Sequence, residues 1–340
     1  MSFVGLAVPY GFILNPEVIH NNSELSPTCK HCKSIYVHSE TNKMKRRGVM
    51  TDIDFVREHY DIGQVLTSTA LQQGNSSKAM LIHAASGKYV LRKLKNEQQA
   101  HAEHKLYQVL ASVNISPKML KARDGLSYII YNHEIYNLQT YINNTIPYHQ
   151  VSIDFVQLGN VISLFHQLIS HLDIPEQKDR YELHQLWSAV SNEVKNSSYE
   201  GIRALTEHTE QCMEYKSKNN TMIHGDLGVW NMLFTKECIH VIDMGEVRRG
   251  NHHFDLAAAL TSTIPSSVNV RELDTIVADF ERGYGHGNIV LNRKSLYQQI
   301  HVWMLRGCLA VIKERGMNSP AILYVERTIK MLNRYKVILH

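Results

Sequence analysis

The chain has 340 residues, of which 44% are hydrophobic and 20% charged, and only 8 are prolines. This composition excludes disordered, collagen-like and low-complexity proteins, and the length favours two lobes over a single core. The net charge of +4 does not suggest nucleic acid as a main partner. The longest apolar stretch, residues 3–14, is too short to span a membrane and is not preceded by the basic residues of a secretory leader. We therefore expect a cytoplasmic protein without a membrane segment.

Residues 1–49 differ from the rest of the chain. They lack amphipathic periodicity and contain six Lys or Arg residues against three Glu. We expect a poorly structured extension, with the functional protein beginning near Met50. Cys29 and Cys32 form a CxxC pair, but a tetrahedral zinc site needs two further ligands and no second CxxC exists. Reduced thiols are the favoured interpretation, and half of a zinc site is the alternative.

The next part, residues 50–134, is predicted to be a β-rich lobe. Short β-like segments separated by glycine-containing turns predict a small antiparallel sheet: 64–69, 80–83, 89–94 and 127–131. Residues 97–113 carry apolar side chains at helical spacing and predict an amphipathic helix. A hinge is expected near residues 131–134.

The remaining part, residues 135–340, is predicted to be a larger α-rich lobe. Long segments with a continuous apolar stripe or helical spacing account for most of it: 158–172, 271–284, 293–315 and 320–336. The expected fold class is therefore α+β, with a small β-rich lobe followed by a larger α-rich lobe.

Three polar residues recur between apolar segments in the most informative part of the chain. Residues 222–234 read MIHGDLGVWNMLF, and residues 239–246 read IHVIDMGE. The apolar runs predict a hairpin that returns the chain, so that Asp243 lies beside Asn231. A carboxylate and an amide oxygen are hard ligands that suit Mg²⁺ better than zinc. Asp226, five residues before Asn231, is left to accept a proton.

These residues resemble the aminoglycoside phosphotransferase and choline kinase superfamily, which has a two-lobed protein-kinase-like fold. The family pattern of His-Gly-Asp, four residues, Asn, and a hairpin ending in Ile-Asp matches residues 224–243. Asp255-Leu-Ala, Leu158-Gly159 with Phe165-His166, and Phe280 with Tyr284 are similar to further family segments, and the resemblance covers roughly residues 58–286.

The resemblance implies an ATP-dependent and Mg²⁺-dependent phosphotransferase. Asn231 and Asp243 would hold Mg²⁺ on the phosphates, and Asp226 would orient the acceptor hydroxyl and take its proton. His224 and Gly225 are interpreted as residues that set the backbone geometry. His166 is interpreted as a buried histidine whose hydrogen bonds are satisfied rather than as a catalyst.

The small lobe must supply a cation for the nucleotide phosphates and a carboxylate to hold that cation. Glu103 shares the apolar stripe of the helix over 97–113, and a carboxylate in that place needs a cationic partner. The family pattern puts the cation at Arg92, so we predict that Arg92 pairs with Glu103 at the nucleotide site. Lys93, on the opposite strand face, is the alternative. Residues 73–77 stand where the phosphate-covering loop would lie, and an ordinary turn fits them equally well.

Two acidic residues follow Asp243. Glu246 fits a solvated loop better than a contact with substrate or a second metal. Asp255 resembles the family residue that steadies the catalytic loop, and it also suits the start of a helix. Only twelve positions separate Asp243 from Asp255, which leaves no room for the long peptide-docking segment of protein kinases.

The predicted function is therefore transfer of the γ-phosphate of ATP to a hydroxyl of a small molecule. The acceptor pocket is expected in the α-rich lobe, between the helices after Asp255 and residues 135–149. Two alternatives stay open: an atypical protein Ser/Thr kinase of the same fold, and a catalytically inactive relative that binds nucleotide.

Overall fold

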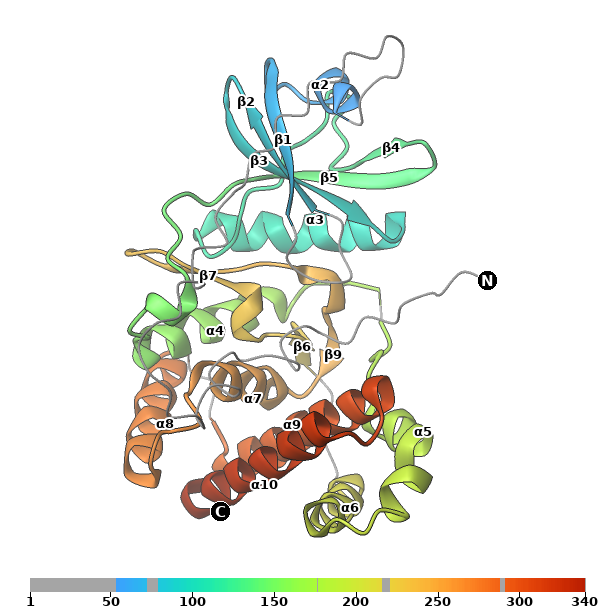
Figure 1. Ribbon diagram of the computed structural model, residues 1–340. Helices are drawn as coiled ribbons and strands as arrows, with labels where there is room; N and C mark the ends of the chain where they lie inside the picture. Colours follow the sequence, from blue (N-terminus) through green and yellow to red (C-terminus); the bar gives the residue numbers. More distant parts are fainter. Residues whose placement is uncertain (1–52, 72–78, 176, 216–220, 288–290, 340) are drawn as a thin grey trace, which may run out of the picture.

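A five-stranded antiparallel sheet forms the N-terminal part of the protein. The structure is a computed structural model that describes residues 53–71, 79–175, 177–215, 221–287 and 291–339. The strands pair in the order β1-β2-β3-β5-β4: β1 (Val65–Leu71), β2 (Ala79–Ala84), β3 (Gly87–Leu94), β4 (Ile129–Tyr131) and β5 (Glu134–Thr140). In Figure 1 this sheet lies at the top of the molecule.

Helix α3 (Glu97–Ser112) runs beneath the sheet (Figure 1). It begins after Asn96, whose side-chain oxygen accepts a hydrogen bond from Gln99 N at 2.8 Å, as in a typical N-cap. Its buried face includes Leu106 and Leu110, which belong to the same hydrophobic cluster as the helices of the C-terminal part. Helix α3 therefore joins the sheet to the larger, helical part.

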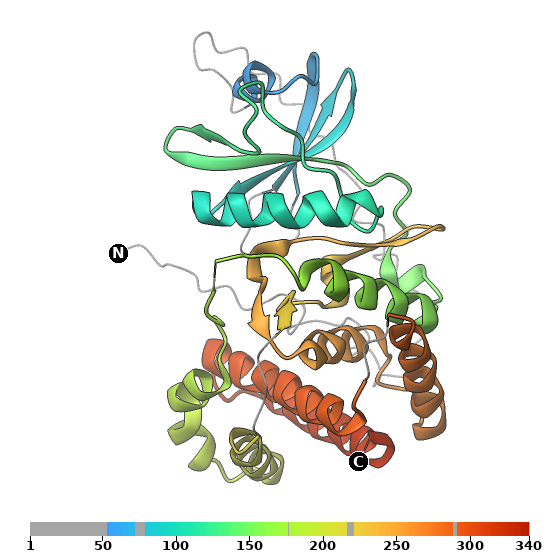
Figure 2. The same ribbon diagram turned by 180° about the vertical axis from the view of Figure 1, so that it is seen from behind.

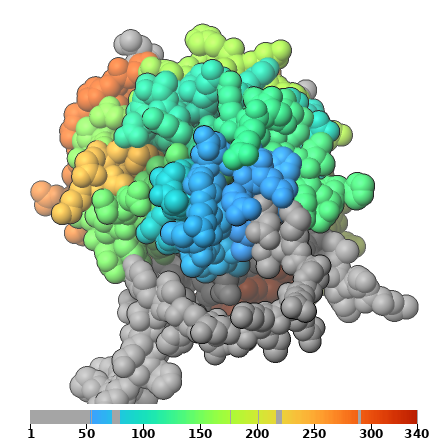
Figure 3. All heavy atoms as spheres, turned by 90° about the horizontal axis from the view of Figure 1, so that it is seen from above, coloured from blue at the N-terminus to red at the C-terminus, as the bar shows by residue number. Residues whose placement is uncertain are grey.

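Helix α2 (Asp54–His59) packs on the sheet near strand β4. The Phe55 ring stacks on Tyr131 with centroids 4.2 Å apart, and Tyr60 and Ile62 complete a small separate core. Viewed from above, the blue atoms of α2 and β1 lie next to the green atoms of the later strands (Figure 3). The sheet thus has its own hydrophobic core.

The turn between β4 and β5 corrects the predicted hinge. Asn132 and His133 have positive φ values of 49° and 62°, as in the tight turns that join two antiparallel strands. Strand β5 then pairs with β3 along its length, from Leu94 opposite Ile135 to Tyr89 opposite Thr140. The sheet therefore continues beyond residue 134, and the chain leaves it only after Thr140.

The C-terminal part is mainly helical, as predicted, and carries two short β-ribbons (Figures 1 and 2). Its helices are α4 (Phe155–Ile169), α5 (Leu183–Lys195), α6 (Glu200–Met213), α7 (His252–Thr263), α8 (Val270–Gly285), α9 (Arg293–Arg315) and α10 (Ser319–Leu339), with 3-10 turns η2 (Tyr148–Gln150), η3 (Val229–Asn231) and η4 (Met244–Glu246). The ribbons are β6 (Thr221–Ile223) with β9 (Arg248–Gly250), and β7 (Met232–Phe234) with β8 (Ile239–Val241). No helix in these described ranges combines the length and apolar character needed to cross a membrane.

Two glycines bring α4 and α8 into close contact. A Cβ atom on Gly159 would lie 2.4 Å from Phe280 O, and one on Gly283 would lie 2.0 Å from Val156 O. Helix α4 packs its buried stripe, which includes Ile162 and Phe165, into the core of the C-terminal part. This packing supports the two ribbons, whose loops carry the motif residues.

Candidate active site

The loop that follows strand β6 is anchored by the buried carboxylate of Asp255. Asp255, in the first turn of α7, has 0% exposure. Its Oδ2 accepts a hydrogen bond from His224 N at 2.6 Å, and its Oδ1 accepts one from Gly225 N at 2.9 Å. His166 donates from Nε2 to Oδ2 at 2.9 Å, and its Nδ1 lies 2.9 Å from Tyr284 Oη. Asp255 thus steadies the loop, and His166 has partners on both ring nitrogens.

His224 and Gly225 set the path of this loop. His224 is fully buried, donates from Nε2 to Ile242 O at 3.0 Å, and accepts from Asp226 N on Nδ1 at 3.3 Å. Gly225 has a φ of +80°, and a Cβ atom there would lie 1.8 Å from Arg248 Nη1. The His ring therefore ties the loop to the segment that leads into Asp243, and only glycine fits the turn before Asp226.

Asp226 and Asn231 face each other across the loop. Asn231 Nδ2 donates to Asp226 O at 2.8 Å and to Asp226 Oδ2 at 3.1 Å, and Trp230 Nε1 lies 3.4 Å from the same Oδ2. Because the amide nitrogen of Asn231 is committed to these bonds, its Oδ1 is directed away from Asp226 and can serve as a metal ligand. Within the described ranges no side chain or backbone group donates a hydrogen bond to Asp226 Oδ1. Asp226 Oδ2 is therefore held by hydrogen bonds, and Asp226 Oδ1 is available to a ligand.

The β7–β8 hairpin brings Asp243 to Asn231, as the sequence predicts. Ile242 N donates to Asn231 O at 3.0 Å immediately before Asp243. Asp243 has a left-handed backbone with φ 59° and ψ 69°, and its N–H donates to Tyr107 Oη at 3.2 Å. A non-glycine residue in this region is strained by about 1 kcal/mol or more, and such strain is typical of functional positions.

Arg92 on β3 joins the two halves of the site. Its Nη1 donates to Glu103 Oε2 at 3.1 Å, which is the predicted pairing, and its Nη2 donates to Asp243 Oδ1 at 2.5 Å. Asn137 and Gln99 also donate to Glu103, at 3.0 Å and 2.8 Å. The fully buried Glu103 is therefore well satisfied, which a carboxylate in a core requires.

Lys93, the alternative cation, points to the other face of the strand. Its ammonium group contacts Glu134 on β5 rather than Glu103. The alternation of side chains along β3 thus separates the two candidates, and only Arg92 reaches Asp243. Residues 73–77, the candidate phosphate loop, lie outside the described residues, as do Cys29 and Cys32.

The two aspartates of the site differ in proton affinity. Burial raises the pKa of the Asp226 carboxyl to about 7, although Arg306 and the hydrogen bond from Trp230 act in the opposite direction. Burial also acts to raise the pKa of Asp243, but the charge of Arg92 outweighs it and holds the pKa below the ordinary value. Asp243 is therefore suited to stay ionised, and Asp226 is suited to exchange a proton near neutral pH.

A second set of charged residues lies beside Asp226 and was not predicted as part of the site. Its members come from three distant segments of the chain: Asp179, Arg180, Glu246, Arg248 and Arg306. The interpretation of Glu246 as a solvated loop residue is wrong, because its side chain is only 16% exposed and pairs with Arg180 and Lys95. The motif spacing placed Glu246 near Asp243 but gave no sign of its partners, and Asp179, Arg180, Arg248 and Arg306 lie outside the motif.

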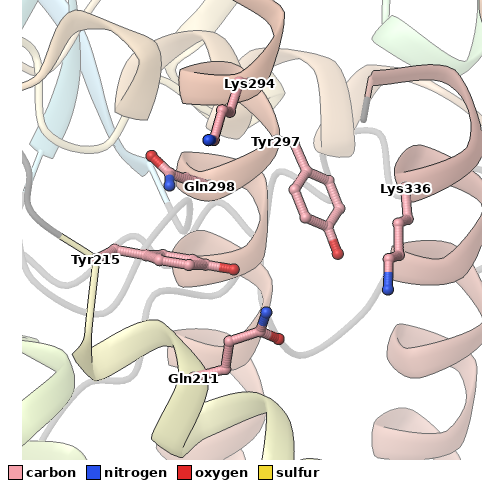
Figure 4. Close-up of a pocket in the computed structure, with 6 residues that line it drawn as sticks. All are labelled: Gln211, Tyr215, Lys294, Tyr297, Gln298 and Lys336. Atoms are coloured by element: carbon pink, nitrogen blue, oxygen red, sulfur yellow. The ribbon is translucent and has the colours of Figure 1, made fainter.

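A cavity of about 220 Å³ lies elsewhere, between α6, α9 and α10 (Figure 4). Its lining consists of polar and aromatic side chains: Gln211, Tyr215, Lys294, Tyr297, Gln298 and Lys336. None of the motif residues lines it. The site around Asp226 and Asp243 is thus defined by the convergence of side chains and not by this cavity.

Comparisons with known proteins show the family and the fold of this chain. The model of the phosphotransferase enzyme family matches residues 67–290. The fold is similar to that of spectinomycin phosphotransferase in complex with ADP and spectinomycin, with a TM-score of 0.60 and 17% identity over 84% of this chain and 92% of that chain. No significant match to a curated protein sequence was found.

Two further solved structures share the fold. Amicoumacin kinase hAmiN, in complex with AMP-PNP, Ca²⁺ and its ligand Ami, has a TM-score of 0.60 and 14% identity over 85% of this chain and 93% of that one. Choline kinase LicA from Streptococcus pneumoniae has a TM-score of 0.53 and 13% identity over 79% and 94%. The predicted two-lobed, protein-kinase-like fold is confirmed. Because the matched residues 67–290 make up more than half of the chain and include the whole motif, the chain belongs to the phosphotransferase enzyme family.

Proposed function

We propose that this protein transfers the γ-phosphate of ATP to a hydroxyl group of a small molecule, with Mg²⁺ as the metal ion. The observation that carries the proposal is the convergence of Asp226, Asn231 and Asp243, from two separate segments, on one point that Arg92 also reaches. Solved structures of the same fold contain ADP or AMP-PNP, which supports a nucleotide as the donor.

The oxygen donors of the site fit Mg²⁺. Asn231 Oδ1 and the Asp243 carboxylate would hold the ion, which when bound offsets the negative charge of the phosphates. No group of three or more His, Cys, Asp or Glu side chains in the described ranges could hold a metal alone. An Mg²⁺ ion commonly takes its other ligands from phosphate oxygens and water.

The remaining residues position the reactants. Arg92, fixed by Glu103, would hold the nucleotide phosphates, and Asp226 would orient the acceptor hydroxyl through its available oxygen. The hydroxyl oxygen bonds to the γ-phosphorus, the bond from that phosphorus to the bridging oxygen breaks, and ADP leaves with the electron pair. The hydroxyl proton passes to Asp226, whose raised pKa suits this role.

A screen with γ-labelled ATP tests the proposal. The full chain is incubated with Mg²⁺ and with sugars, amino alcohols, hydroxy acids, aminoglycosides or whole-cell protein, and Asp226→Asn is the control. We expect label in at least one small alcohol and none with the variant. Label confined to the protein fraction would favour the protein kinase alternative. Absence of label in every fraction, with nucleotide binding retained, would favour the inactive relative.

A further inference from the structure

A buried arginine of helix α9 lies near the loop that carries Asp226. Arg306, on α9, donates from Nε to Tyr181 O at 2.8 Å and from Nη2 to Asp179 Oδ1 at 2.7 Å. Its side chain is only 6% exposed. Within the described ranges Nη1 makes no hydrogen bond. Because a buried guanidinium normally uses most of its five N–H groups, Arg306 is left with donors for a ligand.

Aromatic rings hold this guanidinium and connect it to the catalytic aspartate. Its central carbon lies 5.2 Å from the ring centroid of Phe254 and 5.5 Å from that of Trp303. Trp303 stacks on Trp230 with centroids 6.4 Å apart, and Trp230 in turn contacts Asp226 Oδ2. The charge of Arg306 also acts directly on Asp226, whose pKa it lowers against the effect of burial. Arg306 is therefore linked to Asp226 through the stacked rings of Trp303 and Trp230.

Asp179, the carboxylate that pairs with Arg306, is shared with a second arginine. Asp179 pairs with Arg306 through Oδ1 at 2.7 Å and with Arg248 through Oδ2 at 2.9 Å. Both guanidinium groups have side chains only 6% exposed. One carboxylate thus serves two buried cations, and burial lowers the pKa of Arg306, as expected for a cation that its surroundings do not fully compensate.

The second carboxylate of this cluster is shared in the same way. Glu246 Oε1 lies 2.5 Å from Arg180 Nη2 and 3.4 Å from Lys95 Nζ. Asp226 lies beside this cluster and makes no ion pair with any of the described residues. An acceptor with several ammonium groups would therefore meet three arginines and a single unpaired carboxylate, Asp226, which disfavours it.

Resting on the proposed phosphotransferase function, we infer that the acceptor is an alcohol that also carries an anionic group, and that Arg306 binds this group while Asp226 takes the hydroxyl proton. The anionic group, a carboxylate or a phosphate, supplies the negative charge that the cluster of Asp179, Arg180, Glu246, Arg248 and Arg306 lacks. Arginine is suited to either group because its planar fork can donate two parallel hydrogen bonds. Arg306 is thus the residue that selects the acceptor by charge.

Calorimetric titrations of the full chain test this inference. The protein is first saturated with Mg²⁺ and AMP-PNP, and then titrated with alcohols matched in carbon skeleton: glycerate, glycerol phosphate, glycerol and serinol, and gluconate, glucitol and glucamine. We expect an anionic member to bind at least about tenfold more tightly than the neutral and cationic members of its set. The two anionic three-carbon compounds distinguish a carboxylate from a phosphate ligand.

Variants assign the preference to one residue. Arg306→Gln should reduce the preference to less than about threefold, whereas Arg306→Lys keeps the charge and should retain its direction with weaker binding. Arg315→Gln removes the same charge from an exposed position of the same helix and serves as the matched control. Melting curves show whether each variant is folded, and the comparison of acceptors on the unaltered chain requires no variant.

Three results overturn the inference. These are tighter binding of the neutral or cationic members, no binding of any anionic member, and an unchanged preference in folded Arg306→Gln. Failure of the proposed function is seen separately, as a lack of Mg²⁺-dependent AMP-PNP binding in the first titration or as a lack of label in every small alcohol of the screen. A chain that binds Mg²⁺ and nucleotide but prefers glucamine would keep the proposed function and lose the inference.

Discussion

Replacing Asp255 by asparagine removes the carboxylate that anchors the loop at residues 224–226 and keeps the shape of the side chain. The two carboxylate oxygens accept three N–H groups, from His224, Gly225 and His166, at 2.6–2.9 Å. Asparagine offers one oxygen, which can keep the two bonds now made to Oδ2. The Gly225 N–H then faces an NH₂ group and loses its acceptor.

The expected loss of stability follows from these contacts. A hydrogen bond to a charged group contributes about 1.5–3 kcal/mol, and leaving a buried donor unpaired costs about 1–3 kcal/mol. We therefore expect Asp255→Asn to lower the free energy of unfolding by about 2–4 kcal/mol. Asp154→Asn is the matched control, because Asp154 is the exposed N-cap of α4 and asparagine caps helices equally well.

The difference in stability between the unaltered chain and Asp255→Asn should depend on pH, which gives a second test. Burial acts to raise the pKa of Asp255, but the hydrogen bond and charge of His166 outweigh it and hold the pKa below 3.8. A carboxylate with a lowered pKa stabilises the fold above its unfolded pKa, and this contribution is lost as pH falls through the folded value. Urea unfolding at pH 7 and below pH 4 measures both effects. The anchoring role would be refuted if Asp255→Asn lowered the free energy of unfolding by less than about 1 kcal/mol at pH 7. It would also be refuted if the difference in stability between the two proteins were larger in acid than at pH 7.

The remaining predictions concern the reaction and the packing. Asp226→Asn should reduce turnover by about 10²–10⁴-fold while nucleotide affinity stays within about threefold, as measured by steady-state kinetics and calorimetry. The rate of the unaltered enzyme should rise with pH through about 7, because Asp226 accepts a proton only when ionised, and a flat profile from pH 5 to 9 would contradict this. Gly225→Ala should destabilise the fold by about 1–3 kcal/mol in urea, since the Cβ would meet Arg248 and the φ is +80°. Leu106→Ala, in the core beneath the sheet, should cost about 2–5 kcal/mol, and a loss under about 1 kcal/mol would show that the site collapses around the cavity.

Much of the architecture follows from local pattern. The predicted helices over 97–113, 293–315 and 320–336 correspond to α3, α9 and α10, because each has apolar residues at helical spacing. The hinge could not be placed in the same way. Asn132 and His133 adopt left-handed conformations that form a hairpin turn, and the pairing of β5 with β3 is a long-range contact that local spacing does not reveal.

The candidate site was predictable where the motif fixes spacing. The hairpin brings Asp243 to Asn231 because its two strands have a register that the apolar residues determine. Arg92 could be chosen over Lys93 only by resemblance, and the structure separates them by the face of β3 on which each lies. Charged residues such as Arg306 could not be predicted as part of the site. Their proximity to Asp226 depends on how α9 packs against distant segments, and local sequence does not determine this packing.

The metal and nucleotide site is tested most directly by calorimetric titration of AMP-PNP with and without Mg²⁺. We predict that the unaltered chain binds the nucleotide at least about tenfold more tightly when Mg²⁺ is present, and that Asp243→Ala loses this gain. Asp279→Ala, which removes a partly exposed carboxylate on α8, should retain this gain. Equal affinity with and without Mg²⁺ in the unaltered chain, or a full Mg²⁺ effect in Asp243→Ala, would contradict the assignment.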